Sequence, residues 1–242
     1  MSNSYFKFKQ FTVHQDKSAM KVTTDACLFG AWAADDMKQI QPARILDIGT
    51  GTGLLALMSA QVCADAVIDA VEIEAGAAAQ ATENFNASPW GTRIRIHQTD
   101  IRDHSFKERF DTIICNPPFY ENELASPDAK RNMAHHAGGL LLQDLLPLIG
   151  QYLAADGNAY LLLPAKRKSE IPALLEKNGL KAGHWVWVKQ SHAHDPFRIM
   201  IRCGHKNAEE VSTPESTIII EESPGKYTEA FVGLLKDYYL YL

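Results

Sequence analysis

The chain has 242 residues, a formal net charge of −5 and 46% hydrophobic residues. This length suits one large α/β domain, and the hydrophobic content excludes a mostly disordered chain. Neither a signal peptide nor a run of roughly 18 apolar residues is visible, so we expect a soluble protein with no membrane partner. The negative charge argues mildly against nucleic acid, although the local field over a binding face matters more than net charge.

The cysteines and histidines give no metal-binding pattern. Four cysteines are scattered without a Cys-x-x-Cys pair, so neither a disulfide framework nor a zinc site is indicated, and free thiols suit the cytoplasm. These cysteines are Cys27, Cys63, Cys115 and Cys203. The pairs His135-His136 and His192-x-His194 lack a complete ligand set, and we expect no metal.

From Arg44 onward, short apolar runs alternate with helical patterns. The runs predict strands at 44–48, 67–72, 93–97, 110–115 and 159–163, and the patterns predict helices at 53–63, 74–86, 140–153 and 167–178. The link at 101–108 has room for a short helix only. The β-rich runs 182–189 and 197–203 are too close together for a crossover helix, so they should pair antiparallel. The tail predicts a strand at 217–220 and a helix from 228 to 239.

A glycine-rich turn follows the first predicted strand, which ends near Asp47. Gly49, Gly51 and Gly53 permit positive φ angles and let a ligand approach the backbone at the carboxyl end of this strand. A dinucleotide-binding fingerprint has its third glycine one residue later, so a cofactor without a diphosphate fits better. The spacing resembles motif I of the Rossmann-like methyltransferases, which implies cofactor contacts from Asp47 to Gly53, Thr50 included. A nucleotide-binding enzyme is the alternative at this point.

Two acidic residues close the next two predicted strands. Glu72 ends the second strand, where a carboxylate can accept both hydroxyls of a ribose. Asp100 follows the third strand, where the same superfamily places a contact to an adenine amino group. Glu74 is a candidate for the start of the next helix, where its charge meets the positive end of the helix dipole.

A second motif directly follows the fourth predicted strand and is a candidate catalytic turn. It consists of Asn116, Pro117, Pro118, Phe119 and Tyr120. Two prolines fix two φ angles and remove two N–H donors, so the turn presents acceptors that can hold an –NH₂ group through the Asn116 side chain and the Pro117 carbonyl. These acceptors stabilise the positive charge that develops on nitrogen during methyl transfer. An aromatic ring after the prolines offers a face on which a planar base can stack.

The chain resembles the bacterial tRNA(Val) adenine-N6 methyltransferases over nearly its full length. Besides the two motifs, the resemblance rests on Phe8-Lys9-Gln10-Phe11, Met20 to Trp32, and Tyr227-Thr228-Glu229 to Leu240. In the second run, Thr24 stands where such enzymes are expected to have a glycine.

The resemblance implies an α/β fold with a Rossmann-like, seven-stranded methyltransferase sheet, mostly parallel, with the last hairpin antiparallel and helices on both faces. It also implies a single domain over residues 1–242, in which an N-terminal extension of residues 1–43 packs on a catalytic core of residues 44–242. The implied cofactor is S-adenosyl-L-methionine, and the implied partner is tRNA. The expected target is the adenosine 3′ of the anticodon (position 37) of tRNA(Val), and the protein is expected to be a monomer.

The same resemblance assigns further candidate residues. Thr23 and Asp25 should lie beside the cofactor, in addition to Asn116. Candidate contacts to the RNA phosphates are Lys9, Arg131, Lys166 and Arg167.

Three alternatives stay open. The same acceptor pair could hold a glutamine amide in a protein N5-methyltransferase, although Phe119-Tyr120 favours a nucleobase. Enzymes that methylate a base of rRNA have a similar turn but are usually longer. A non-catalytic RNA-binding or scaffold protein could retain the fold, but the intact Gly49, Glu72 and Asn116 argue against it.

Overall fold

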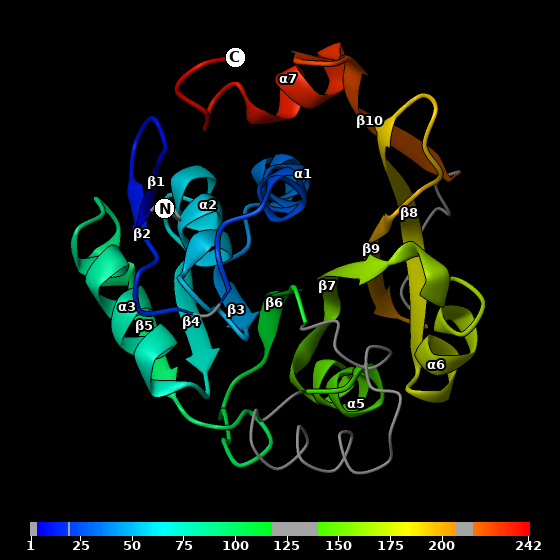
Figure 1. The fold of residues 1–242 in the computed structure, drawn as a ribbon. Helices are drawn as coiled ribbons and strands as arrows, with labels where there is room; N and C mark the ends of the chain where they lie inside the picture. Colours follow the sequence, from blue (N-terminus) through cyan, green and yellow to red (C-terminus); the bar gives the residue numbers. More distant parts are fainter. Residues whose placement is uncertain (1–3, 19, 118–139, 207–214) are drawn as a thin grey trace, which may run out of the picture.

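The central sheet contains nine strands among the residues that the computed structural model describes, which are 4–18, 20–117, 140–206 and 215–242. Their order is β11-β10-β8-β9-β7-β6-β3-β4-β5 (Figure 1). In chain order the strands are β3 (Arg44–Ile48), β4 (Val67–Glu72), β5 (Ile94–Gln98), β6 (Phe110–Cys115), β7 (Leu153–Pro164), β8 (Leu180–Ser191), β9 (Arg198–His205), β10 (Ser216–Ser223) and β11 (Lys226–Tyr227).

The seven strands from β3 to β9 confirm the predicted sheet. β3, β4, β5, β6 and β7 run parallel, and β9 pairs antiparallel with both β7 and β8. β10 then pairs parallel with β8, and β11 pairs antiparallel with β10. These two strands are added to the sheet beyond β8. The parallel connections bring the carboxyl ends of β3 to β7 to one edge of the sheet, which we call the carboxyl edge.

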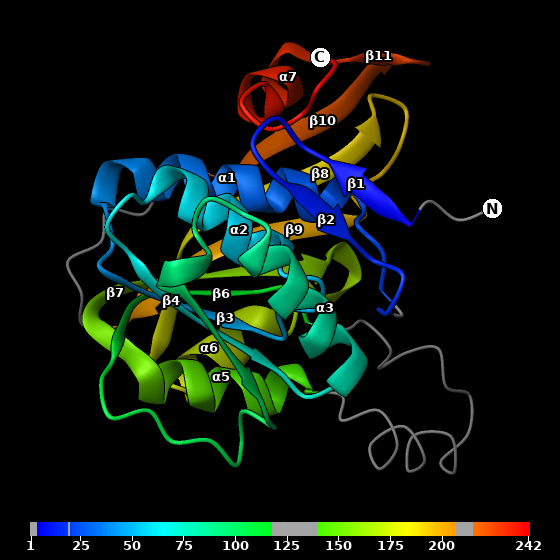
Figure 2. The same ribbon diagram turned by 90° about the vertical axis from the view of Figure 1, so that its left-hand side faces the viewer.

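Helices cover both faces of the sheet, as predicted (Figures 1 and 2). One face packs against α1 (Thr24–Ile40), α2 (Leu54–Val62), α3 (Ala75–Asn86), α7 (Glu229–Leu235) and the hairpin of β1 (Tyr5–Lys7) and β2 (Thr12–His14). The other face packs against α5 (Leu142–Tyr152) and α6 (Ile171–Lys177). Neighbouring strand residues alternate between the two apolar cores, because Ile45 belongs to the first core and Leu46 to the second.

Three predicted helices differ from the structure. The helix expected at 228–239 ends at Leu235, where a turn follows and Tyr239 forms a β-bridge with Phe8. Residues 101–108 contain no helix; the segment begins with a turn in which Asp103 N–H donates to Asp100 O, and the Phe106 ring then packs edge-on against Phe110 and Tyr152. The helix expected at 167–178 starts only at Ile171, because Pro172 lies in its first turn, where proline is favoured. The 3₁₀ turn η3 (Ala165–Arg167) precedes it, and a second one, η1 (Gly91–Arg93), precedes β5.

The link from β3 to α2 contains a buried acid. Asp47 is fully buried, and its Oδ2 accepts hydrogen bonds from Thr50 Oγ1 at 2.6 Å and from the Ala56 N–H at 3.1 Å. Its Oδ1 is buried without a hydrogen-bond partner among the described residues. Burial raises the pKa of Asp47 from its ordinary 3.8 to about 7. Asp47 therefore fixes the turn but carries its charge at an energetic cost.

The last glycine of this turn is required by both conformation and packing. Gly53 has φ +87°, and a Cβ atom there would lie 2.4 Å from Cε1 of Phe85 on α3. We predict that Gly53→Ala lowers the free energy of unfolding by roughly 3 kcal/mol, because left-handed strain and steric overlap add. Gly179→Ala, with φ +70° and open space around the new methyl group, should cost only about 1 kcal/mol.

Urea unfolding of both variants measures this difference. Phe85→Leu should recover part of the loss in the Gly53→Ala background. Equal losses for the two glycine variants would contradict the packing argument.

The raised pKa of Asp47 also predicts a pH dependence of stability. Between about pH 4 and pH 7 the native protein holds a proton on Asp47 that the unfolded chain has released, so the free energy of unfolding should fall as the pH rises through this window. Asp47→Asn should remove this component, whereas the exposed Asp65→Asn should leave it in place. Chemical denaturation at pH 5 and pH 8 measures the change, and an unaltered slope in Asp47→Asn would exclude this role.

Candidate functional site

Strand register brings the two sequence motifs together at the carboxyl edge. Ile48 on β3 pairs with Val71 on β4 and with Cys115 on β6. The residues that follow are Gly49, Glu72 and Asn116, so these three leave neighbouring strands at the same level. Adjacent strands lie about 4.8 Å apart, which puts all three within reach of one small ligand.

The glycine turn opens toward the space above this edge. Gly49 and Gly51 have φ angles of 71° and 57°, and a Cβ atom built on either would meet nothing within 4 Å. The N–H groups of Gly49 and Thr50 both donate to Val71 O, at 2.9 and 3.0 Å, and hold the turn against β4. A ligand can therefore approach the backbone at Gly49 and Gly51, whereas Gly53 packs against Phe85.

Glu72 anchors the turn and keeps spare hydrogen-bonding capacity. Its side chain is buried, and its Oε2 accepts the Gly51 N–H at 2.8 Å while Oε1 accepts the Glu74 N–H at 2.9 Å. Each carboxylate oxygen has two lone pairs, so each can still accept one hydroxyl. Glu74 in turn caps α3, as predicted, because its carboxylate accepts from the N–H groups of Gly76 and Ala77.

Asn116 carries an unsatisfied acceptor directly beside this turn. Its Oδ1 is buried and has no hydrogen-bond partner among the described residues. Leaving a buried acceptor unpaired costs about 1–3 kcal/mol, so such atoms are rare unless a ligand completes them. An N–H donor arriving at the carboxyl edge would satisfy Asn116.

Asp100 has a partner that the sequence does not indicate. Nε of Arg102 lies 2.9 and 3.0 Å from the two carboxylate oxygens, and the Arg102 backbone N–H donates to Oδ1 at 2.9 Å. These hydrogen bonds lower the pKa of Asp100 and keep it ionised. Gln98 on β5 pairs with Glu72 on β4, so the turn that contains Asp100 lies beside Glu72.

Thr23 and Asp25 lie at the start of α1. Thr23 is the N-cap residue, and its side chain accepts the Ala26 N–H. Asp25 Oδ2 accepts from Nε of Arg198 at 2.8 Å. Arg198 begins β9 opposite Pro164, which ends β7, so this pair places the start of α1 at the carboxyl edge. The predicted antiparallel hairpin places the start of the strand 197–203, and so Arg198, at the carboxyl edge. The sequence did not indicate that Arg198 pairs with Asp25.

The candidate RNA contacts are divided between the carboxyl edge and the opposite edge of the sheet, where the amino ends of β3 to β7 lie. Lys166 and Arg167 follow β7 at the carboxyl edge; Lys166 is exposed and Arg167 pairs with Glu170. Lys9 instead donates a hydrogen bond to the carbonyl oxygen of Lys236. The next residue, Asp237, accepts a hydrogen bond through its carbonyl from Gln61, which lies at the end of α2 away from the glycine turn. Since α2 runs away from the glycine turn for nine residues, roughly 13 Å, Lys9 lies at the opposite edge.

Four candidate residues lie outside the described part of the chain. They are Pro118, Phe119, Tyr120 and Arg131. Pro117 is described and buried.

The described residues show no group of three or more His, Cys, Asp or Glu side chains arranged to hold a metal ion. None of their helices combines the length and apolar character that crossing a membrane requires. All four cysteines are free and buried, which confirms the prediction of free thiols.

The chain is similar to known methyltransferases. The model of the methyltransferase small domain matches residues 32–145. A tRNA1(Val) (adenine(37)-N6)-methyltransferase from Parabacteroides distasonis is 40% identical, over 99% of this chain and 99% of that protein. A protein of the same name from Cytophaga hutchinsonii is also 40% identical, over the full length of both chains.

Solved structures support the fold. A predicted O-methyltransferase from Agrobacterium tumefaciens superposes with a TM-score of 0.66 at 19% identity, covering 88% of this chain and 96% of that one. A ribosomal protein L11 methylase from Lactobacillus delbrueckii subsp. bulgaricus gives a TM-score of 0.52 at 20% identity, covering 74% and 78%. The fold is thus Rossmann-like, and full-length identity to the curated relatives decides the family. The chain belongs to the tRNA1(Val) (adenine(37)-N6)-methyltransferases.

Proposed function

We propose that this protein transfers a methyl group from S-adenosyl-L-methionine to N6 of an adenine in tRNA, namely adenosine 37 of tRNA1(Val). The observation that carries the proposal is the buried, unsatisfied Oδ1 of Asn116 beside the open glycine turn. An exocyclic amine is a donor that fits this acceptor, and the names of the relatives supply the adenine and the tRNA.

The residues at the carboxyl edge fit this cofactor. Glu72 keeps one free lone pair on each oxygen for the two ribose hydroxyls, and Asp100 is an ionised acceptor for the adenine amino group. Gly49, Thr50 and Gly51 leave room for the methionine moiety, and Oδ1 of Asp47 is a further unsatisfied acceptor near it. We also assign Thr23 and Asp25 to the wall of this site.

When bound, S-adenosyl-L-methionine supplies an electrophilic methyl group. Asn116 Oδ1 accepts one N–H of the target amine and the carbonyl of Pro117 accepts the other, which turns the nitrogen lone pair toward that methyl group. The same two acceptors stabilise the positive charge that grows on nitrogen, worth roughly 3 kcal/mol for each well-placed group. No charged side chain is required to remove the proton, because the methylated ammonium loses it readily to water.

We assign the remaining candidates to RNA recognition. Lys166 and Arg167 lie at the carboxyl edge and are suited to hold phosphates beside the target base. Phe119 and Tyr120 would stack the adenine, and Arg131 would contact a phosphate. The position of Lys9 at the far edge makes it the weakest of these candidates. We further propose that the protein acts as a monomer in the cytoplasm.

The assignment of Glu72 predicts a specific binding defect. Glu72→Gln replaces one acceptor oxygen by a donor, so the Kd for S-adenosylhomocysteine should rise about 10- to 100-fold, as expected for losing a hydrogen bond to a charged group. The control is Glu83→Gln, an exposed residue paired with Lys17 away from the turn. Calorimetric titration of both variants measures this, and an unchanged Kd for Glu72→Gln would remove Glu72 from the cofactor site.

Mass analysis of nucleosides tests the proposed reaction. Unmodified tRNA1(Val) is incubated with protein and cofactor, digested and analysed, and we expect one N6-methyladenosine per molecule. A tRNA with adenosine 37 replaced by guanosine is the matched control and should gain none. Another methylated nucleoside would revise the target, and methylation of a protein glutamine without any methylation of tRNA would refute the proposal.

A further inference from the structure

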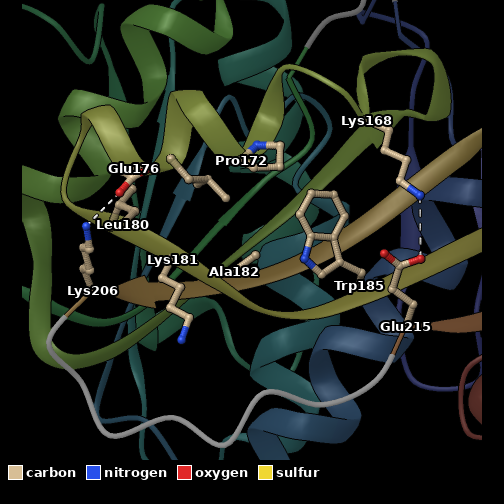
Figure 3. Close-up of a pocket in the computed structure, with 10 residues that line it drawn as sticks. Lys168, Pro172, Glu176, Leu180, Lys181, Ala182, Trp185, Lys206 and Glu215 are labelled. Carbon is tan, nitrogen blue, oxygen red and sulfur yellow. Dashed lines mark hydrogen bonds and ion pairs between the residues drawn. The ribbon is translucent and has the colours of Figure 1, made fainter.

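A hollow of about 480 Å³ lies between α6 and β8, on the face of the sheet that α5 and α6 cover (Figure 3). This volume is within the range of sites that bind small ligands, roughly 300–1,000 Å³. Its apolar lining consists of Pro172, Leu175, Leu180, Ala182 and Trp185, and its charged lining consists of Lys168, Lys181, Lys206, Glu176 and Glu215.

Trp185 lies in the hollow with Lys168 at the same end, whereas the side chain of Lys181 points away from Trp185 (Figure 3), because Lys181 pairs with Gly204 and so projects from the opposite face of β8. The indole is half-buried, since part of it packs against the apolar core below. Trp187 lies two residues further along β8 and on the same face. The ammonium group of Lys168 is 4.6 Å from the centre of the Trp187 ring, which is a cation–π contact. An aromatic ring bordered by cations is a combination that nucleic-acid-binding surfaces use to stack bases.

The charges of the hollow favour an anion. Lys206 pairs with Glu176 at 2.8 Å and Lys168 with Glu215 at 3.8 Å, and Lys181 forms no ion pair with any described residue. The two pairs are largely exposed, and such pairs contribute only about 0–1 kcal/mol, so a phosphate can compete for either lysine. At the end of the hollow that Lys168 forms, the three cations Lys166, Arg167 and Lys168 outnumber the two glutamates Glu170 and Glu215, so this end is net positive.

Strand register relates this hollow to the proposed methylation site. Trp185 pairs with Ile201 on β9, Ile201 with Leu161 on β7, and Leu161 with Cys115, the residue before Asn116. Three strand spacings separate Trp185 from Cys115, roughly 14 Å. Lys168, at one end of the hollow, follows Lys166 and Arg167 by one or two residues. One RNA molecule can therefore reach both places.

We propose that this hollow binds an unpaired nucleotide of the tRNA substrate, with its base stacked on Trp185 and a phosphate held by Lys168. The proposal rests on the proposed function, because it assigns a second contact to the same RNA. It places that contact away from the reacting adenine, so it contributes to affinity and not to the chemical step.

The test compares tRNA binding by Trp185 variants. Trp185→Ala should raise the Kd for unmodified tRNA1(Val) about 10-fold, as expected for losing one base–aromatic stack, while kcat and the Kd for S-adenosylhomocysteine stay unchanged. Trp185→Phe should retain most of the affinity. Trp90→Phe is the matched control, because Trp90 packs against Phe11 on the other face of the sheet. Quenching of tryptophan fluorescence by tRNA should be reduced in Trp185→Phe, where Trp187 remains nearby, and kept in Trp90→Phe.

The phosphate contact is tested separately. Lys168→Gln should weaken tRNA binding and reduce the salt dependence of log Kd by about one counterion, whereas Lys38→Gln, near the opposite edge, should do neither. This variant also decides the case if Trp185→Ala does not fold.

The proposal is overturned if wild-type protein methylates tRNA but the Trp185 and Lys168 variants bind it like the wild type. It is also overturned if free AMP or polyglutamate, but not tRNA, protects Trp185 from quenching by iodide. If the wild-type protein neither binds nor methylates tRNA, the proposed function fails instead.

Discussion

The parallel pairing of β4, β3 and β6 is the constraint on which the rest of the site depends. It aligns Glu72, Gly49 and Asn116 at one level of the carboxyl edge, although these residues are far apart in the sequence. Each of the three strands is short and mainly apolar, with Asp47 and Glu72 held by specific hydrogen bonds, so a register shift would leave buried polar groups without partners. The stability of the core and the geometry of the site are therefore set by the same backbone hydrogen bonds.

The described side chains at this level are mainly acceptors. Asp47 and Asn116 each have an oxygen without a partner, and Glu72 has oxygens that are only partly used. Such an arrangement favours a ligand that is rich in donors and positively charged, which describes a sulfonium cofactor with an ammonium and two hydroxyl groups. The energetic cost of burying Asp47 beside Glu72 is consistent with a site that is completed by its ligand.

The acidic composition and an RNA substrate are compatible because charge is distributed unevenly along the sheet. Asp47, Glu72 and Asp100 gather at the carboxyl ends of β3 to β5, whereas Lys166, Arg167 and Lys168 follow the carboxyl end of β7. Net charge averages over both halves and hides this division. A phosphate backbone interacts with the local field, which favours the half of the sheet that is free of the three acids.

Much of this arrangement could be predicted from the sequence, for physical reasons. The strands 44–48, 67–72 and 110–115 are apolar runs bounded by turn residues, and their observed bounds are as predicted. β7 begins before its apolar centre because Leu153 and Asn158 pair with β6, and β8 does so because Leu180 and Lys181 pair with β9; no hydrophobic pattern reveals these pairings. The partner of Asp25 depends on a tertiary contact across 173 residues, so Arg198 carried no signal of its own. Arg102 lies only two residues from Asp100, and it was missed because the strand pattern does not specify the conformation of this turn.

The most direct test of this account is the single-turnover rate of methyl transfer to tRNA1(Val) by Asn116→Ala at saturating cofactor and RNA. The matched control is Asn158→Ala, on β7 opposite Thr112 and away from the carboxyl edge. If the Asn116 side chain holds the target amine, its loss should slow transfer about 10²- to 10³-fold while cofactor affinity and the control stay near the wild type. A rate for Asn116→Ala close to that of Asn158→Ala would contradict the account.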